Sequence, residues 1–489
     1  MSGVLERFAP LFHPRSVAFI GASREIRKWG FVILFHLLHG GYKGKVFPIN
    51  PKDKEILGLP AYPSVLDVPE AIDMAVIVVP PLAVLQALQD CVAKGVKAGV
   101  VITAGFAEMG EEGRRLQSQM VEIARQGGMR LVGPNCNGVM NPYIGLHPHM
   151  PPAFPKPGPL AVVSQSGNIA TSLVTRATVH GMGISRYVSS GNEADLHIED
   201  FLEYFGDDPD TKVIMAYIEG IRDGKRFFEV SRKVTRKKPI VALKVGYTQA
   251  GARAARSHTA ALAGSDQVFN ALCRQAGITR VLDMNELFYV ASAFLRQPLP
   301  QGKRVGMVTG GGGWGVVGAD ACARVGLEVT DLPEETLREL DSFLPSWWNR
   351  GNPVDIVAGS RAGDIRDSLA ALFKCPVVDS VILLGRIGLG QRRIDMLKSS
   401  RLAAEYGFDA LAAETSKEER EVAQVIIDAI DSYGKPIVVA SDMAIASAAK
   451  DESIQMLEHS GIVCYPMPDD AATVLAHLAR YSEYLRESP

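Results

Sequence analysis

Short apolar runs rich in β-branched residues alternate with helix-like stretches along the chain, and this alternation constrains the fold more than any other feature. Such runs are typical of parallel strands buried on both faces, because the helices that connect them cover the sheet. Most runs end at or near Gly, Pro or Asn, which places loops at the carboxyl edge of each sheet. Open α/β folds bind their ligands at that edge, so we expect an α/β protein with its sites there.

Two turn-rich passages divide the expected strands into three blocks. The prolines of 147–159 (HPHMPPAFPKPGP) cannot donate to helix or sheet ladders, and 296–303 (RQPLPQGK) is similarly rich in turn residues. Both passages read as linkers, which predicts domains at residues 1–146, 158–297 and 302–489. The expected strands are 16–20, 46–49, 74–79, 98–102 and 130–132, then 160–163, 184–188, 212–217 and 239–245, then 304–308, 327–329, 380–384, 436–440 and 462–465.

Composition argues against several classes of protein. The net charge is −2 and 22% of residues are charged, so no strong field favours nucleic acid or an anionic lipid surface. The most apolar run, Met74–Leu85, is too short to span a bilayer and is interrupted by prolines, so we expect no membrane segment. The six cysteines are widely spaced and form no CxxC pair, which favours reduced thiols and a cytoplasmic protein.

The loops of the first block predict a phosphate-containing ligand. The first strand runs into Gly21, Ala22 and Ser23 and then into a helix, where free amide groups suit a phosphate and Lys28 adds a charge. A solvated basic helix start is the alternative, and the absence of GxGxxG gives no support for NAD. The later loops of this edge are singly ordinary turns but jointly indicate one cleft for an extended nucleotide. Their candidate residues are Asn50, Pro51, Lys52, Val79, Pro80, Ala104, Gly105, Asn135 and Cys136.

The second block begins with a strand that ends in small polar residues: Ser164, Gln165, Ser166, Gly167 and Asn168. These suit a helix N-terminus whose amide groups bind an anion, although an ordinary cap without a ligand is the simpler interpretation of this motif alone. Glu219 follows a later buried strand, where a carboxylate is either a satisfied edge residue or the partner that orients a histidine.

His258 lies in a stretch of small residues, 251–264 (GARAARSHTAALAG), rather than on an apolar helix face. An imidazole in that setting is a candidate nucleophile if a carboxylate fixes its tautomer. His147 and His149 form an HxH without a recognisable third ligand, so we expect loop histidines and no metal site.

The third block opens with a strand followed by a run of glycines, 310–315 (GGGGWG). Backbone at such a strand-to-helix turn wraps easily around an anion, which makes Gly311, Gly312, Gly313 and Trp314 candidates for phosphate or acyl binding. The run is not a Walker A loop, since no Gly-Lys-Ser/Thr follows, and a plain flexible turn is the alternative.

Taken in order, these segments resemble the α subunit of ADP-forming acyl-CoA synthetases, relatives of succinyl-CoA synthetase. The most specific match is Arg256–Thr259 with Leu262–Asp266, which is similar to the SHTG and LAGSD segments of that family. The resemblance implies a Rossmann-like CoA-binding domain followed by two flavodoxin-like doubly wound domains. It also implies the reaction acyl-CoA + ADP + phosphate ⇌ acid + CoA + ATP.

The resemblance assigns roles to the candidate residues. His258 would carry the phosphoryl group between an acyl phosphate and a nucleotide, and Glu219 would orient it. The loops at 164–168 and 311–314 would hold phosphate and the acyl group, and the first-block loops would bind CoA. Two residues depart from the family pattern: Ala260 stands in place of a Gly, and Asn137 in place of an apolar residue.

No nucleotide-binding ATP-grasp segment is recognisable in the chain. The resemblance therefore implies that ADP or ATP and Mg²⁺ bind a separate ATP-grasp β subunit, in an α2β2 heterotetramer. Two alternatives stay open. One is a CoA-dependent acyl or carbamoyl transfer protein of similar architecture that has no need of His258, and the other is a non-catalytic CoA-sensing protein.

Overall fold

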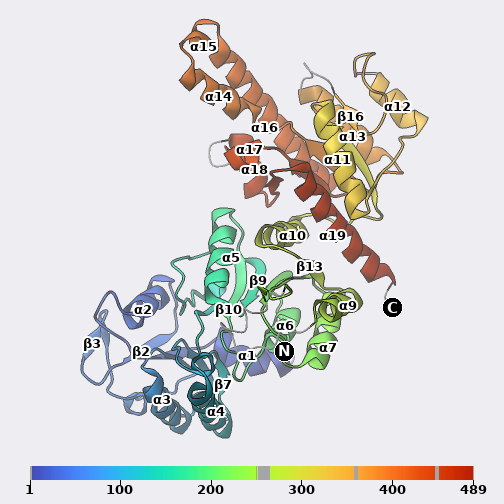
Figure 1. The fold of residues 1–489 in the computed structure, drawn as a ribbon. Coiled ribbons are helices and arrows are strands. Elements are labelled where there is room, and N and C mark those ends of the chain that lie inside the picture. The colour runs from blue at the N-terminus through green and yellow to red at the C-terminus, as the bar shows by residue number, and fades with distance from the viewer. Residues whose placement is uncertain (1–2, 249, 252–264, 357–361, 447–450, 488–489) are drawn as a thin grey trace. The chain divides into compact units, whose positions relative to one another are not determined.

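A computed structural model describes residues 3–248, 250–251, 265–356, 362–446 and 451–487. The chain divides into two compact units, Met1–Leu287 and Phe288–Pro489, and each unit is described by itself (Figure 1). The first unit contains two large sheets and the second unit contains one.

The first sheet has the strand order β2-β1-β5-β6-β7, and all of its pairings are parallel. Every residue of β1 is buried, as expected for a central parallel strand covered on both faces. The strands are β1 (Ser16–Ile20), β2 (Lys45–Ile49), β5 (Met74–Ile77), β6 (Ala98–Val101) and β7 (Arg130–Val132). The other elements of this part are α1 (Gly3–Phe12), α2 (Trp29–His39), η1 (Val65–Asp67), α3 (Pro81–Lys94), η2 (Ala107–Met109), α4 (Glu111–Gln126) and a small hairpin, β3 (Glu55–Ile56) with β4 (Leu59–Pro60).

Local sequence explains where the helices of this sheet begin and end. Helix α3 starts with Pro81 at its first position, where the missing N–H has no helical partner, and ends at Gly95 with φ of 84°. Helix α4 has Glu111 and Glu112 in its first turn and Arg125 in its last turn, which complements the helix dipole.

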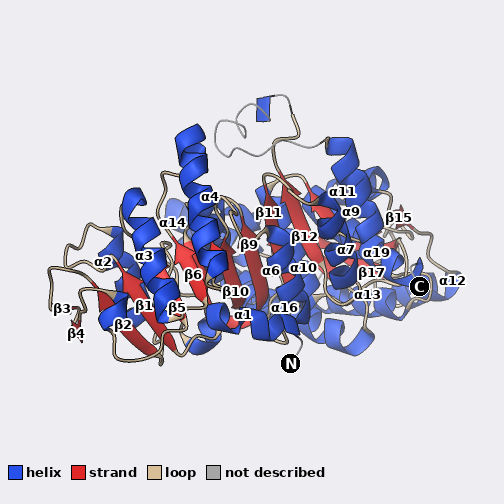
Figure 2. Cartoon of the chain, turned by 90° about the horizontal axis from the view of Figure 1, so that it is seen from below, coloured by secondary structure: helices blue, strands red, loops and turns tan. Residues whose placement is uncertain are grey.

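The second sheet has the order β13-β12-β11-β9-β10-β8, with β8 antiparallel to β10 and the other pairings parallel. Figure 2 shows its strands among blue helices. The strands are β8 (Gly138–Met140), β9 (Pro157–Ser164), β10 (Ile184–Ser189), β11 (Val213–Ile218), β12 (Ile240–Lys244) and β13 (Thr279–Val281). The helices are η3 (Pro142–Ile144), α5 (Gly167–Val179), α6 (Ile198–Asp207), α7 (Gly224–Thr235), α9 (Asp266–Ala276) and α10 (Met284–Arg296), whose residues continue into the second unit.

One hydrophobic core joins the two sheets of the first unit. Phe8 and Phe12 of α1 pack in the same cluster as Tyr204 of α6, and the Phe12 and Tyr204 rings stack with centroids 4.5 Å apart. A buried cation lies beside this core, because Arg186 of β10 is only 1% exposed and donates to Asp208 at 3.0 Å. This shared core fixes the loops of one sheet relative to those of the other, and the candidate site depends on that arrangement.

The sheet of the second unit is also parallel, with the order β15-β14-β17-β18-β19 and β16 paired with β14. Its strands are β14 (Arg304–Thr309), β15 (Glu328–Val329), β16 (Val354–Asp355), β17 (Ser380–Leu384), β18 (Ile437–Ala440) and β19 (Cys464–Tyr465). Its helices are α11 (Gly312–Val325), α12 (Glu334–Asp341), α13 (Ala362–Lys374), α14 (Leu389–Ser399), α15 (Arg401–Glu405), α16 (Phe408–Tyr433), α17 (Met443–Ala446), α18 (Glu452–His459) and α19 (Pro468–Glu487).

The prediction of an α/β protein with parallel sheets is confirmed, and most expected strands agree with the observed ones to within two residues. The prediction that 147–159 is only a linker is partly wrong, because β9 begins at Pro157. Proline cannot donate to a ladder but its carbonyl still accepts, and Pro159 O accepts from Lys212 N. The division into domains at 1–146, 158–297 and 302–489 stays a prediction. Among the described residues, no helix is long and apolar enough to cross a membrane.

Candidate functional site

The carboxyl edge of the first sheet brings together the loops that were expected to bind a nucleotide. Gly21 follows β1 and donates to Ile49 O of β2 at 3.1 Å, so the ends of these strands are level. Asn50 Nδ2 donates to Ala22 O at 2.8 Å, and on the other side Asn135 N donates to Thr103 O at 2.9 Å. The structure therefore lines up the loops after β2, β1, β5, β6 and β7 along one edge, as their strand order requires.

Gly21 is needed for the shape of this edge. It has a φ of 92°, and a Cβ there would collide with the carbonyl oxygen of Val78 in the next strand. Its own carbonyl oxygen lies against Gly30 in α2, where a Cβ would collide in turn. The first turn of the sheet is thus closed by two glycines, which leaves backbone rather than side chains at the mouth of the edge.

The polar side chains of this edge differ in their exposure to solvent and in their hydrogen-bond partners. Ser23 Oγ accepts from Glu25 N at 3.1 Å, and the exposed Lys28 pairs with Glu25 at 2.5 Å. Lys52 is exposed, and its amide donates to Asn50 Oδ1 at 2.7 Å. Cys136 is 1% exposed and lies 3.2 Å from Val101 O, and burial raises the pKa of its thiol to about 12, so this thiol is not a nucleophile at neutral pH.

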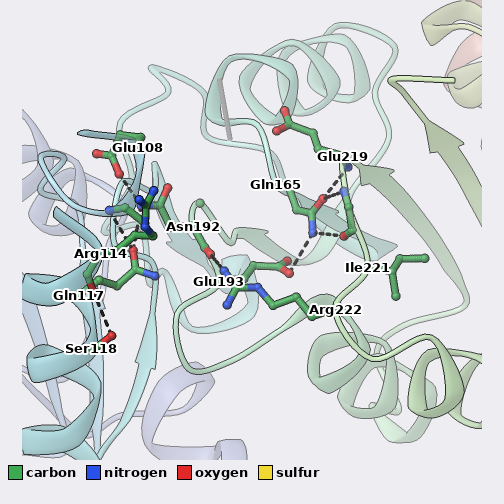
Figure 3. A pocket seen from close by; sticks show the side chains of 13 residues that line it. Glu108, Arg114, Gln117, Ser118, Gln165, Asn192, Glu193, Glu219, Ile221 and Arg222 are labelled. Atoms are coloured by element: carbon green, nitrogen blue, oxygen red, sulfur yellow. Dashed lines mark hydrogen bonds between the residues drawn. The ribbon is translucent and has the colours of Figure 1, made fainter. Parts of the chain in front are cut away.

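A cavity of about 530 Å³ lies in the first unit, between the η2–α4 segment of the first sheet and the loops that follow β9, β10 and β11 (Figure 3). These loops meet because the carboxyl ends of β9, β10 and β11 are adjacent in the second sheet. The lining residues are Ala107, Glu108, Arg114, Gln117, Ser118, Gln165, Gly191, Asn192, Glu193, Glu219, Gly220, Ile221 and Arg222.

Gln165 connects three of the loops around this cavity. Its Oε1 accepts from the amides of Glu219 and Gly220, at 2.5 and 2.9 Å. Its Nε2 donates to Gly220 O at 2.8 Å and to Glu193 Oε2 at 2.9 Å. The amide group of Gln165 thus uses its four hydrogen-bonding positions, and its orientation is determined by its partners.

Glu193 is a buried carboxyl group on the wall of the cavity. It is 3% exposed, its φ is 50°, and its Oε1 accepts from Ser190 Oγ at 2.7 Å. Burial raises the pKa of Glu193 to about 7, although the hydrogen bonds from Ser190 and Gln165 favour the ionised form. A carboxyl group that titrates near neutral pH inside a cavity marks a candidate functional position.

Asn192 links the two sheets across the cavity. Its Nδ2 donates to Glu108 Oε2 at 2.5 Å and to Gln117 Oε1 at 3.1 Å. The other oxygen of Glu108 accepts from the amides of Gly105 and Phe106, at 2.6 and 3.2 Å. Burial opposes ionisation of Glu108, but the bonds from Asn192 and from the backbone outweigh it and lower the pKa of this carboxyl.

Glu219 begins the loop after β11 and is 7% exposed. Its carbonyl oxygen accepts from Lys244 Nζ at 3.1 Å, and its amide is held by Gln165. The backbone of Glu219 is therefore fixed on both sides, and its side chain contributes to the lining of the cavity (Figure 3).

The N-terminus of α5 lies directly after Gln165. Ser164 Oγ donates to Ser166 O at 2.7 Å and accepts from Ser166 N at 3.2 Å, which closes a tight turn before the helix. Gly167 begins α5, where a Cβ would overlap the side chain of Asn137. Asn168 follows in the first turn, so the expected residues 164–168 form one strand-to-helix loop beside Glu219.

The glycine-rich loop of the second unit repeats this geometry. Thr309 Oγ1 donates to Gly311 O at 2.9 Å and accepts from Gly311 N at 3.3 Å, and α11 begins at Gly312. A Cβ at Gly313 would meet nothing within 4 Å, so the first turn of α11 is open at that position. Trp314 follows in the same turn and lies near Gly385. Each unit therefore presents a helix N-terminus behind a hydroxyl-closed turn, which is a suitable place for an anion.

His258, the predicted phosphoryl carrier, and Ala260, which departs from the family pattern, lie outside the described residues. His147 and His149 are buried loop residues whose ring nitrogens lie 3.1 Å apart. No cluster of three or more His, Cys, Asp or Glu side chains that suits a metal ion occurs in the described part of the chain.

Sequence reasoning did not single out several residues of the cavity as site residues, namely Glu108, Arg114, Gln117, Ser118, Asn192, Glu193, Ile221 and Arg222. Glu193 is the most informative of these. The only local sequence signal that Glu193 belongs to a site was its position two residues after Gly191, at the end of a buried strand. Nothing in the sequence indicated that Gln165 would be its hydrogen-bond partner.

Family models match three consecutive stretches of the chain. Residues 15–142 match a CoA binding domain, residues 157–294 a succinyl-CoA ligase like flavodoxin domain, and residues 305–389 a ligase-CoA domain. These matches follow the expected order of a Rossmann-like CoA-binding domain and two flavodoxin-like domains.

Known proteins resemble the chain along nearly its full length. The α subunit of acetate–CoA ligase [ADP-forming] II from Pyrococcus furiosus is 39% identical over 96% of this chain and 97% of its own. Acetate–CoA ligase [ADP-forming] from Methanocaldococcus jannaschii is 43% identical over 71% of this chain but only 48% of its own. The solved dinucleotide forming acetyl-coenzyme A synthetase 1 of Ca. Korarchaeum cryptofilum, in complex with phosphate and ADP, is 34% identical with a TM-score of 0.84 and covers 98% of each chain.

Proposed function

The chain belongs to the family of ADP-forming acyl-CoA ligases, as an α-subunit-type member, and from this premise we propose how its residues carry out the reaction. The enzyme interconverts acyl-CoA, ADP and phosphate with a carboxylic acid, CoA and ATP. The observation that carries the proposal is the position of the cavity, where the η2–α4 segment that follows the β6 loop of the first sheet meets Glu219 and Gln165, next to the N-terminus of α5.

CoA binds along the carboxyl edge of the first sheet in this proposal. The backbone at Gly21–Ser23 and the loops at Asn50–Lys52, Val79–Pro80, Ala104–Gly105 and Asn135–Cys136 line its path, with Lys28 near the phosphates. The order of these loops along the edge supports an extended ligand, and the match of residues 15–142 to a CoA binding domain supports its identity.

The chemistry proceeds in two balanced steps on this chain. A phosphate oxygen attacks the thioester carbonyl, the C–S bond breaks, and CoA leaves as a thiolate that takes a proton, which gives an acyl phosphate. A His258 ring nitrogen then attacks phosphorus, the bond from phosphorus to the acyl oxygen breaks, and the carboxylate leaves. We assign stabilisation of the negative charge to the amides of 164–168 and 311–314, and orientation of His258 to Glu219.

The second half of the cycle needs a partner. Transfer of the phosphoryl group from His258 to ADP, with Mg²⁺, is assigned to an ATP-grasp β subunit in an α2β2 heterotetramer. The relatives support this division, since those named α subunits match along 97% of their length. Acetate–CoA ligase [ADP-forming] from Methanocaldococcus jannaschii, whose name specifies no subunit, is about twice as long as the part it shares. The acid is a small carboxylic acid, and acetate is the first candidate because of the names of these relatives.

We propose the domain boundaries 1–146, 158–297 and 302–489 for this enzyme, supported by the three separate large sheets. Strand β8 is the exception, because it precedes residue 146 but pairs with β10 of the second sheet. We also propose a cytoplasmic location. The six cysteines are buried and unpaired, as is usual for a protein in a reducing compartment.

Labelling of the histidine tests the mechanism. The purified chain is incubated with ³²P-phosphate and acetyl-CoA, and separately with its β subunit, ATP and Mg²⁺. We expect a label that is acid-labile and base-stable and that is absent from His258→Ala, with Glu219→Gln reduced. A wild-type chain that binds CoA but takes no label under either condition would overturn the phosphohistidine mechanism in favour of a CoA-binding sensor.

A further inference from the structure

The buried Glu193 and the half-buried Gln165 form a hydrogen-bonded pair that joins separate loops of the second sheet. Ser190 Oγ donates to Glu193 Oε1 at 2.7 Å, and Gln165 Nε2 donates to Glu193 Oε2 at 2.9 Å. On its other side, Gln165 Oε1 receives the amides of Glu219 and Gly220. The pair therefore runs from the loop after β10, through the loop after β9, to the backbone of Glu219 after β11 (Figure 3).

We propose that Glu193 and Gln165 are positioning residues that hold Glu219 and the N-terminus of α5 in the geometry needed for phosphoryl transfer, and that ionisation of Glu193 strengthens this hold. The inference rests on the proposed function, since it concerns the same site. Gln165 is adjacent to Ser166, the N-cap of α5, so one side chain sets both the carboxylate of the site and its anion-binding loop.

The donors around Glu193 indicate which protonation state of its carboxyl group fits the site. Both of its oxygens accept, one from Ser190 and one from Gln165, which is the pattern of an ionised carboxylate. A proton on Oε2 would face the donating Gln165 amide, and a proton on Oε1 would require the Ser190 hydroxyl to turn toward Ser164 O, which lies 3.4 Å away. Hydrogen bonds to a charged group are also stronger than neutral ones, so ionisation holds the Gln165 amide more firmly.

Titration of Glu193 falls in a range where the enzyme can be assayed, since burial raises its pKa to about 7. Charged groups of both signs surround Glu193, so no single neighbouring group determines whether its carboxyl group is ionised. The charged or titratable groups near it are His197 and Glu199 after its own loop and Glu108, Arg114, Glu219 and Arg222 around the cavity.

Rates of label incorporation from ³²P-phosphate and acetyl-CoA, measured on the full chain between pH 5.5 and 8.5, test the proposal. We expect Glu193→Gln to lower the rate roughly tenfold at pH 8 and much less at pH 6, because the charge-assisted bond is lost only where wild-type Glu193 is ionised. The apparent KM for acetyl-CoA should change little. Glu229→Gln, an equivalent change on the exposed face of α7, is the matched control and should leave the rate unchanged at every pH.

A reciprocal exchange separates positioning from simple damage to the fold. Gln165→Glu places two carboxylates together and should lower the rate more than Glu193→Gln does. The double variant Gln165→Glu with Glu193→Gln restores one acceptor for the two amides and one donor between the side chains. Gly220 O still lacks the donor that Gln165 Nε2 supplies at 2.8 Å, so the double variant should recover part of the rate lost in Gln165→Glu.

Three outcomes decide the matter. The inference is supported if wild type takes the label, if the ratio of the wild-type rate to the Glu193→Gln rate rises as the pH passes 7, and if the double variant recovers rate. Normal wild-type labelling with rates that are equal in Glu193→Gln at all pH values, or with no recovery in the double variant, overturns it and leaves the proposed function intact. Absence of any wild-type label overturns the proposed function itself.

Discussion

Asn192 donates to Glu108 across 84 positions of sequence, with 2.5 Å between Nδ2 and Oε2. This bond joins the loop after β10 in the second sheet to the η2 turn of the first sheet. It places the part of the chain that we assign to CoA beside the part that we assign to phosphoryl transfer. The relative position of the two half-sites therefore depends on a polar contact as well as on the shared core.

Replacing Asn192 by Asp tests this contact. The change removes the donor and places a second carboxylate against Glu108, so we expect a loss of about 1–3 kcal/mol in the free energy of unfolding at pH 8. The double variant Asn192→Asp with Glu108→Gln restores one donor and one acceptor in reversed order and should recover part of that loss. Denaturant unfolding of the single and double variants is the measurement, and equal stability of all three proteins would contradict the role of the bond.

Stability should depend on the ionisation of Glu193. Burial raises its pKa to about 7 from an ordinary value of 4.5, so between these values the folded protein holds a proton that the unfolded chain has released. The stabilisation from this proton is complete below the unfolded pKa and is lost as the pH rises through 7. We expect the Tm of Glu193→Gln, relative to that of wild type, to increase by about 2–4 °C as the pH is raised from 5 to 8. Calorimetry of both proteins at each pH is the measurement.

The same substitution that weakens the proposed positioning should thus become more favourable to the stability of the fold, relative to wild type, as the pH rises. A Tm difference that stays constant or shrinks as the pH rises would show that Glu193 is not a buried group of raised pKa. Glu229→Gln again provides the control, since that carboxylate is exposed on α7.

The turn at Gly21 predicts a linked effect on stability and CoA binding. Gly21→Ala introduces a Cβ at a φ of 92° that collides with Val78 O, so the loop must move away from the sheet edge. We expect a loss of about 1–3 kcal/mol in stability and a weaker affinity for CoA, measured by thermal unfolding and isothermal titration calorimetry. Gly224→Ala is the control, because a Cβ at Gly224 meets nothing within 4 Å. Unchanged CoA affinity in Gly21→Ala would exclude Gly21 from the binding edge.

Substitution of Arg186 should lower the stability of the fold more than most substitutions outside the cavity. Its guanidinium is 1% exposed and donates to Asp208 at 3.0 Å and to Asp210 at 2.8 Å. Arg186→Met leaves the Asp208 carboxylate buried without its cation, which should cost about 3–5 kcal/mol in denaturant unfolding. Adding Asp208→Asn removes the uncompensated charge and should return part of this stability, and failure to do so would mean that Arg186 acts through packing alone.

The sequence by itself determined most of the strands, their order of appearance and the loops that carry the candidate residues. Runs such as 16–20 and 380–384 coincide with β1 and β17, because a strand buried on both faces must be apolar along its length. The glycines at 21 and 310–313 were also informative, since a strand that ends at glycine can turn tightly into a helix.

Only the tertiary structure decided which of these loops meet. Gln165, Glu193 and Glu219 are separated by 28 and 26 positions, and their bonds exist because β9 lies between β10 and β11 in the sheet. The antiparallel strand β8 and the pair of Asn192 with Glu108 were missed for the same reason. A hydrogen bond between side chains on separate loops depends on where whole elements pack, and that packing energy is spread over the core rather than encoded near either residue.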